Sequence, residues 1–98
     1  MTTYERIMRI RRAVVFRFEQ DIFGSCYPEL VGKPIVINLS RHERNDPVRT
    51  YAHECLHIIY RLSEKETRRM EARVWKSLTS KQRFLLARKL YNREWKVR

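Results

Sequence analysis

In the second half of the chain, apolar residues recur at spacings of three and four, the pattern of helices that bury one face. The first such helix is predicted to begin at Asp46, a good N-cap residue, with Pro47 in its first turn, and to run to about Arg61. Capping boxes at residues 63–66 and 79–82 open two more helices, with predicted ends near positions 78 and 95. The last helix is predicted to turn four side chains inward: Phe84, Ala87, Leu90 and Tyr91.

The first half of the chain mixes one helical segment with strands. Residues 3–12 have the pattern of an amphipathic helix, whereas residues 13–18 alternate as in a strand, with Val14, Phe16 and Phe18 on one face. Residues 20–33 contain Gly24, Pro28 and Gly32 and are expected to form turns, with room for one short strand. Residues 34–39 are the clearest strand, and Pro34 limits it to a sheet edge or a strand start. The sum is one α+β domain over residues 1–98, a two- or three-stranded sheet packed on three or four helices.

The predicted helix after Asp46 contains a His-Glu-x-x-His motif, formed by His53, Glu54 and His57. Helical positions i and i+4 share a face, so the two imidazoles can hold one ion together. Imidazole suits zinc, and a catalytic zinc site takes three protein ligands and leaves one position for water. Glu54 is then the predicted general base for that water. The motif is typical of zinc-dependent peptidases.

The third ligand is expected to be a carboxylate on the next helix. The apolar stripe there comprises Val74, Trp75 and Leu78, and stepping back three or four residues from the first two leads to Glu71. A carboxylate on an inward face needs a partner, because an unpaired buried charge is costly. A zinc ion held by two histidines would be such a partner, so Glu71 is the predicted third ligand.

Other roles for these carboxylates remain open. Glu64 lies on the same side of its helix as Glu71, in the first turn, and is the reserve candidate for the third ligand. Glu66 is assigned to the capping box. Glu71 could instead form a surface ion pair with Arg68 or Lys76.

The motif at residues 53–57, followed by a glutamate on a second helix, resembles the gluzincin clan of zinc peptidases. The short length further resembles the minigluzincins, single-domain proteins whose fold is similar to the catalytic core of integral-membrane metallopeptidases. The resemblance implies that His53, His57 and Glu71 bind Zn²⁺ and that Glu54 serves as base and acid. It also implies that the strand at residues 34–39 holds the substrate backbone by β-augmentation.

Two features of a working peptidase are left open by the sequence. The group that steadies the oxyanion could be Tyr60, Tyr91 or His42. The chain offers little to form a second wall of the cleft, and its end carries the aromatic residues Tyr91 and Trp95. One hypothesis is therefore a latent enzyme, similar to the minimal members of the clan, in which residues 91–98 block the substrate.

The net charge of +11 adds a second line of interpretation. Such a surface attracts polyanions, including nucleic acid. The favoured alternative is a solvated, charge-rich surface of the thermophilic kind, because no base-reading motif accompanies the charge. Three alternative functions remain: a DNA-associated SprT-like protease, a basic nucleic-acid-binding protein with a structural zinc, and a peptidase that cleaves a single regulatory partner.

The remaining features point to a cytoplasmic protein. The longest apolar runs are too short to span a bilayer, and arginines at positions 6 to 12 interrupt any signal-peptide core. Cys26 and Cys55 are expected to be reduced thiols. Cys55 lies about 200° around the helix from His53, so it is predicted to be buried and to face away from the metal.

Overall fold

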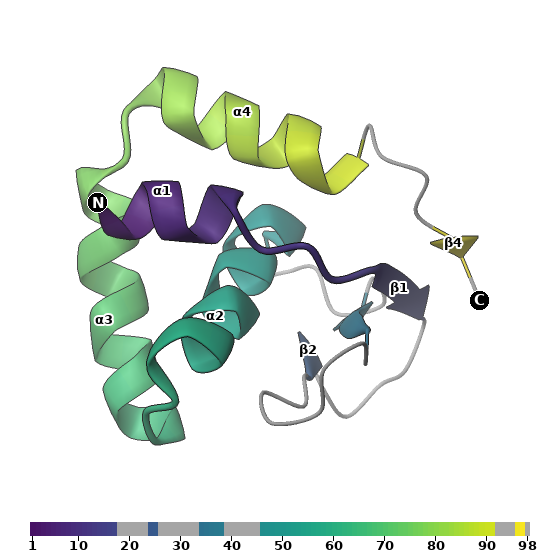
Figure 1. The fold of residues 1–98 in the computed structure, drawn as a ribbon, viewed down its shortest axis with the longest axis horizontal. Coiled ribbons are helices and arrows are strands. Elements are labelled where there is room, and N and C mark those ends of the chain that lie inside the picture. The colour runs from purple at the N-terminus through teal and green to yellow at the C-terminus, as the bar shows by residue number, and fades with distance from the viewer. Residues whose placement is uncertain (18–23, 26–33, 39–45, 92–95, 98) are drawn as a thin grey trace.

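The computed structural model describes residues 1–17, 24–25, 34–38, 46–91 and 96–97 (Figure 1). Four helices and one mixed sheet form an α+β domain within these residues. The elements in chain order are α1 (Thr3–Met8), β1 (Val14–Arg17), β2 (Gly24–Ser25), β3 (Ile35–Asn38), α2 (Pro47–Tyr60), α3 (Glu64–Ser77), α4 (Ser80–Tyr91) and β4 (Lys96–Val97).

Side-chain caps define the ends of the three long helices. The Asp46 carboxylate accepts a hydrogen bond from the backbone N–H of Val48 at 2.9 Å. Helix α2 ends at Tyr60, and the cap residue after it, Arg61, has a left-handed φ of 51°. The Ser63 hydroxyl accepts from the Glu66 N–H at 3.2 Å at the start of α3. These contacts confirm the predicted bounds of α2 and the predicted start of α3.

The start of α4 is also confirmed, but its end is not. Thr79 and Gln82 exchange hydrogen bonds between side chain and backbone at 2.9 and 3.1 Å, which is a complete capping box. The described part of the helix ends at Tyr91, and the predicted extension to position 95 falls on residues outside the described part. Lys96–Val97 form a strand. The first helix is likewise shorter than predicted, ending at Met8 rather than near position 12.

The sheet has the strand order β2-β3-β1-β4. Strand β1 runs parallel to β3 and β4, and β2 runs antiparallel to β3. The predicted two or three strands are therefore corrected to four. Strand β2 lies within residues 20–33, where one short strand was allowed for, whereas β4 was not predicted because two residues are too few to show alternation. Strand β3 is interior, so of the two positions that Pro34 allowed, the strand start is the correct one.

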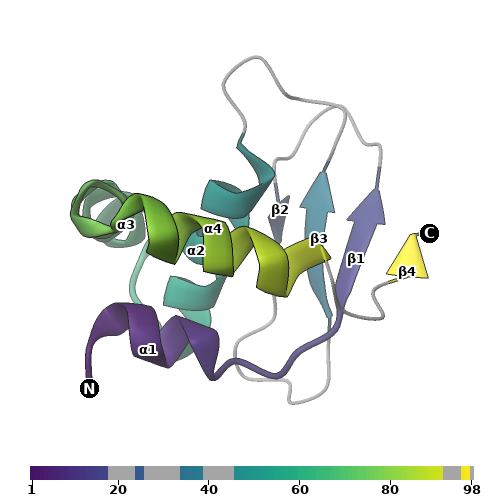
Figure 2. The same ribbon diagram turned by 90° about the horizontal axis from the view of Figure 1, so that it is seen from above.

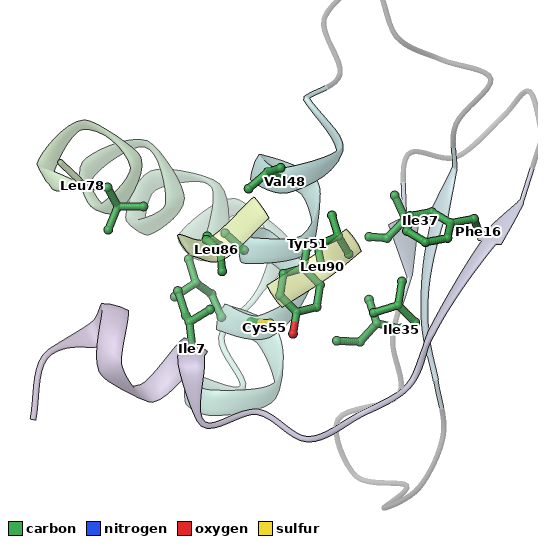
Figure 3. Packing of buried hydrophobic residues seen from close by; sticks show 13 residues of the cluster. Ile7, Phe16, Ile35, Ile37, Val48, Tyr51, Cys55, Leu78, Leu86 and Leu90 are labelled. Carbon is green, nitrogen blue, oxygen red and sulfur yellow. The ribbon is translucent and has the colours of Figure 1, made fainter. Parts of the chain in front are cut away.

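The helices cover one face of the sheet, and α2 is the central one (Figure 2). It packs against β2 and β3 on one side and against α1, α3 and α4 on the others. Figure 3 shows the core between these layers, to which α1, β1, β3, α2 and α4 contribute buried side chains, together with Leu78 just after α3. Its buried members are Ile7, Val14, Phe16, Ile35, Ile37, Val48, Tyr51, Ala52, Cys55, Leu56, Leu78, Leu86 and Leu90.

The rotation of α4 about its axis differs from the prediction. Leu90 is buried and Ala87 partly buried as expected, but Phe84 is 65% exposed and Tyr91 51% exposed. Leu86 takes the inward position instead. Apolar residues occur all around this helix, so its periodicity alone does not select a face, and the contacts with α1 and α2 do.

Lys89 shows how α4 is held against its neighbours. Its ammonium group is buried and donates to the Ile7 carbonyl at 3.0 Å and to the Tyr51 hydroxyl at 2.6 Å. One side chain thereby connects α4 with α1 and α2.

Cys55 is fully buried in the core as predicted, and burial raises the pKa of its thiol to about 12, so it stays protonated at neutral pH. Cys26 lies outside the described residues.

Candidate metal centre

The candidate site lies between α2 and α3. Only residues 61–63 separate the two helices, so α3 turns back and packs directly on α2. Each helix presents polar side chains on the facing side, spaced by three or four residues. Those on α2 are Arg49, His53 and His57, and those on α3 are Glu64, Thr67 and Glu71.

One carboxylate brings the two histidines together. The Nε2 atom of His53 is 2.7 Å from one oxygen of Glu64, and the Nε2 atom of His57 is 2.9 Å from the other. The imidazole rings are 4.9 Å apart at an interplanar angle of 78°. One ligand atom from each of the three residues lies within 4.8 Å of the others. His53, His57 and Glu64 are therefore close enough to bind one metal ion.

The opposite nitrogen of each ring is held by α3. The Nδ1 atom of His53 is 3.1 Å from Glu71, whose carboxylate accepts hydrogen bonds, so this nitrogen carries a proton. The Nδ1 atom of His57 is 3.3 Å from the Thr67 hydroxyl, which is directed to the Leu62 carbonyl at 3.5 Å and can accept from the ring. When an imidazole loses its Nε2 proton to bind an ion, these partners hold the remaining proton at Nδ1.

Glu71 and Glu64 occupy different places in this arrangement. The Glu71 carboxylate contacts His53 at Nδ1, the ring nitrogen opposite Glu64, and also pairs with the Arg49 guanidinium. Glu64, the reserve candidate, is the carboxylate at the Nε2 atoms, and it also lies 3.4 Å from Arg68. The role of Glu71 as a ligand stays a prediction. Its cationic partner is Arg49, not the Arg68 or Lys76 that the surface-pair alternative named.

Two residues of the site were missed by the sequence reasoning. Thr67 is fully buried on α3, three residues after Glu64 and four before Glu71. Arg49 is four residues before His53 on α2. One further step of four along each facing stripe would have identified both.

Two arginines pack on the ring of Trp75 at one end of the site. The Arg49 guanidinium lies 6.0 Å from the centre of the Trp75 ring, and that of Arg83 lies 4.8 Å from it. Arg83 also donates to the Trp75 carbonyl at 2.6 Å. Contacts of this kind restrain the indole and the Arg49 side chain. Arg49 is thereby positioned to hold the Glu71 carboxylate.

The charges of the site shift its pKa values. Burial alone would lower the pKa of His53, but the hydrogen bond with Glu71 and the charges of Glu54 and Glu64 outweigh burial and raise it. Burial would raise the pKa values of Glu64 and Glu71, yet their hydrogen bonds with the histidines, and that of Glu71 with Arg49, lower both. In the absence of a metal ion, the site is thus held by charge-assisted pairs between imidazole and carboxylate.

These shifts predict how the stability of the metal-free protein depends on pH. The contribution of His53 is complete below its ordinary pKa of 6.5 and is lost as pH rises through its raised value. The contributions of Glu64 and Glu71 are complete above their ordinary value of 4.5 and are lost as pH falls through their lowered values. We therefore expect the site to stabilise the metal-free protein most between the two ordinary pKa values, 4.5 and 6.5. The measurement is the midpoint temperature of thermal unfolding as a function of pH.

The high net charge also changes with pH, so a matched variant is needed. The variant H53Q lacks the imidazole that pairs with the carboxylates, so the loss of stability above pH 6.5 that comes from His53 should vanish. The pH dependence that comes from the remaining charges should persist. The difference between wild type and H53Q is therefore the informative curve. A difference that grows as pH rises from 6.5 would contradict the pairing.

Glu54 follows His53 on α2 and is 6% exposed. Its negative charge is among the causes that raise the pKa of His53. Glu54 is thus a buried carboxylate whose charge acts on one of the two histidines of the site.

Of the three candidate oxyanion groups, the two tyrosines have contacts with α1 and the sheet, and the histidine lies outside the described residues. The Tyr60 hydroxyl is 3.1 Å from that of Thr3, and the Tyr60 ring lies beneath Arg6 at 5.9 Å. The Tyr91 ring stacks on Phe16, with ring centres 6.0 Å apart. His42 lies outside the described residues. The two tyrosines are therefore engaged with α1 and with the sheet.

The sheet bears on two further expectations about the substrate. Strand β2 already pairs with Val36 and Ile37 of β3, so the expectation that β3 binds substrate by β-augmentation is wrong, and β2 forms this edge of the sheet. In the C-terminal segment, Lys96–Val97 pair with β1 at the other edge, and Figure 1 shows β4 and α3 on opposite sides of the molecule. Residues 92–95 lie outside the described part, and latency stays a prediction.

Comparison of the chain with known protein families, with curated proteins and with solved structures found no match in any of the three. The class is therefore given by fold and site alone: an α+β domain with a candidate metal site of two histidines and one glutamate. Among the described residues, no helix has the length and apolar character needed to cross a membrane.

Proposed function

We propose that the protein is a zinc-dependent metallopeptidase in which His53, His57 and Glu64 hold the ion and Glu54 is the general base. One observation carries the proposal. Both Nε2 atoms of the His-Glu-x-x-His motif face a single carboxylate, that of Glu64. Both Nδ1 atoms, on the other side of the rings, form hydrogen bonds with Glu71 and Thr67 of α3. Ligand histidines in metalloproteins show this division between the two ring nitrogens.

The donor set fits zinc. Two imidazoles and one carboxylate are the ligands of several catalytic zinc sites, and they leave a fourth position open. Ligand atoms of a tetrahedral zinc ion are about 3.3 Å apart, somewhat more than the 2.7 and 2.9 Å from the Glu64 oxygens to the imidazoles. When bound, zinc would supply a Lewis acid that polarises a carbonyl and lowers the pKa of water.

The residues of this chain would then divide the work. Glu54 would accept a proton at its carboxylate from the attacking water and return it to the leaving amine. Glu71 would orient the His53 imidazole and raise its basicity through the hydrogen bond at Nδ1. The other oxygen of Glu71 is held by Arg49. Thr67 would orient His57 in the same way. The resemblance to the minigluzincins supports this assignment of a zincin-like fold.

The proposal is tested by removing and restoring the metal. The chelated protein should not cleave an unfolded protein such as casein, and one equivalent of zinc should restore both metal content and cleavage. Mass spectrometry of the products would show peptide-bond hydrolysis directly. Zinc bound at one equivalent without any hydrolysis would contradict an active peptidase and leave a structural zinc or the latent enzyme.

A further inference from the structure

Helix α3 has a second face that the candidate metal site does not use. Four cationic residues lie four, four and three positions apart, which places them in one stripe along the helix. At 1.5 Å per residue the stripe is roughly 16 Å long. All four side chains belong to exposed residues: Lys65, Arg69, Arg73 and Lys76.

The charge of this stripe is not neutralised locally. Within the described part of the chain, none of the four cations forms an ion pair. Of the carboxylates on α3, Glu64 and Glu71 face the histidines of α2, and Glu66 accepts from the Ser63 hydroxyl at the start of the helix. The face therefore presents uncompensated positive charge on a chain whose net charge is +11.

The chemistry of the face decides between two kinds of acidic partner. A protein interface has an apolar centre, whereas interfaces with nucleic acid are polar and strongly positive. The exposed large apolar residues among those described are Met1, Phe84 and Tyr91, and none is on α3. The one aromatic residue of α3, Trp75, lies beneath Arg49 and Arg83. The stripe thus offers phosphate contacts without an apolar centre and without a free ring on which bases could stack.

We propose that the outer face of α3 is a binding surface for the phosphate backbone of duplex DNA. Binding there does not depend on the base sequence and does not need a metal ion. The stripe and the candidate metal site occupy opposite faces of one helix.

Fluorescence anisotropy with a short labelled duplex of mixed sequence tests the surface. The variant K65Q/R69Q/R73Q/K76Q removes the stripe with a residue that favours helices. The control R9Q/R11Q/K81Q/R88Q removes the same charge from exposed residues of other segments. We expect the stripe variant to bind at least about tenfold more weakly than the control, with a salt dependence reduced by about 0.9 per lost phosphate contact.

Every outcome bears on the proposal. Equal weakening in both variants would overturn it, because net charge alone would then explain binding. Binding of polyglutamate but not of the duplex would overturn it in favour of an acidic protein partner. Circular dichroism confirms that each variant is folded. Duplex binding that persists in chelator separates this surface from the metal site, so the DNA proposal and the peptidase proposal can fail independently.

Discussion

Replacing Glu54 with glutamine should lower peptide hydrolysis by roughly 10²–10⁴-fold while the bound metal remains at one ion per chain. The carboxylate is next to His53 but is not among the residues whose ligand atoms converge. Glutamine has nearly the same shape, so a residue that is 6% exposed can be replaced with little change in packing. The amide cannot accept the proton of water at neutral pH, so the base is lost without the ligands.

The measurement pairs turnover of a quenched peptide with metal content of the same sample. E66Q is the matched control, because Glu66 is an exposed glutamate whose described contacts are with the helix cap of α3. It should keep both activity and metal. An E54Q protein that retains full activity would remove Glu54 from the mechanism, and one that loses its metal would make Glu54 a ligand.

Glu64 and Glu71 should differ in how strongly their removal weakens metal binding. In E64A the third ligand is gone, so we expect metal affinity to fall by more than the 10–100-fold typical of an orienting group. In E71A the imidazole of His53 loses its partner at Nδ1, and affinity should fall by about 10–100-fold. Competition with a chromophoric chelator measures both constants on one scale.

The comparison is designed so that either residue can prove to be the ligand. E66A again controls for loss of a carboxylate on α3, although its effect on the cap has to be followed by thermal unfolding. The reverse order of affinities, with E71A weaker than E64A, would restore Glu71 as the third ligand. R49A adds an independent check, since it should act through Glu71 and add little to E71A.

The sequence predicted correctly those features of the candidate site that depend on a single helix. Asp46, Ser63 and Thr79 are local caps, and the structure places helix starts at all three. The shared face of His53 and His57 also follows from the helical repeat alone. Local hydrogen bonding and the period of 3.6 residues determine such features, whatever the rest of the chain does.

The relation between elements could not be obtained in this way. Glu64 and Glu71 lie two turns apart on the same side of α3, and only the packing of α3 on α2 decides which one meets the Nε2 atoms. The same holds for α4, where Leu86 rather than Phe84 turns inward, and for β2 and β4, which exist through pairing with β3 and β1.

The sequence by itself therefore determined where the three long helices start and the motif that α2 carries. The tertiary structure decided which side chains face one another across helices and strands. The physical reason is that the helical repeat and the caps act within a few residues, whereas the choice among faces depends on the apolar area that each packing buries.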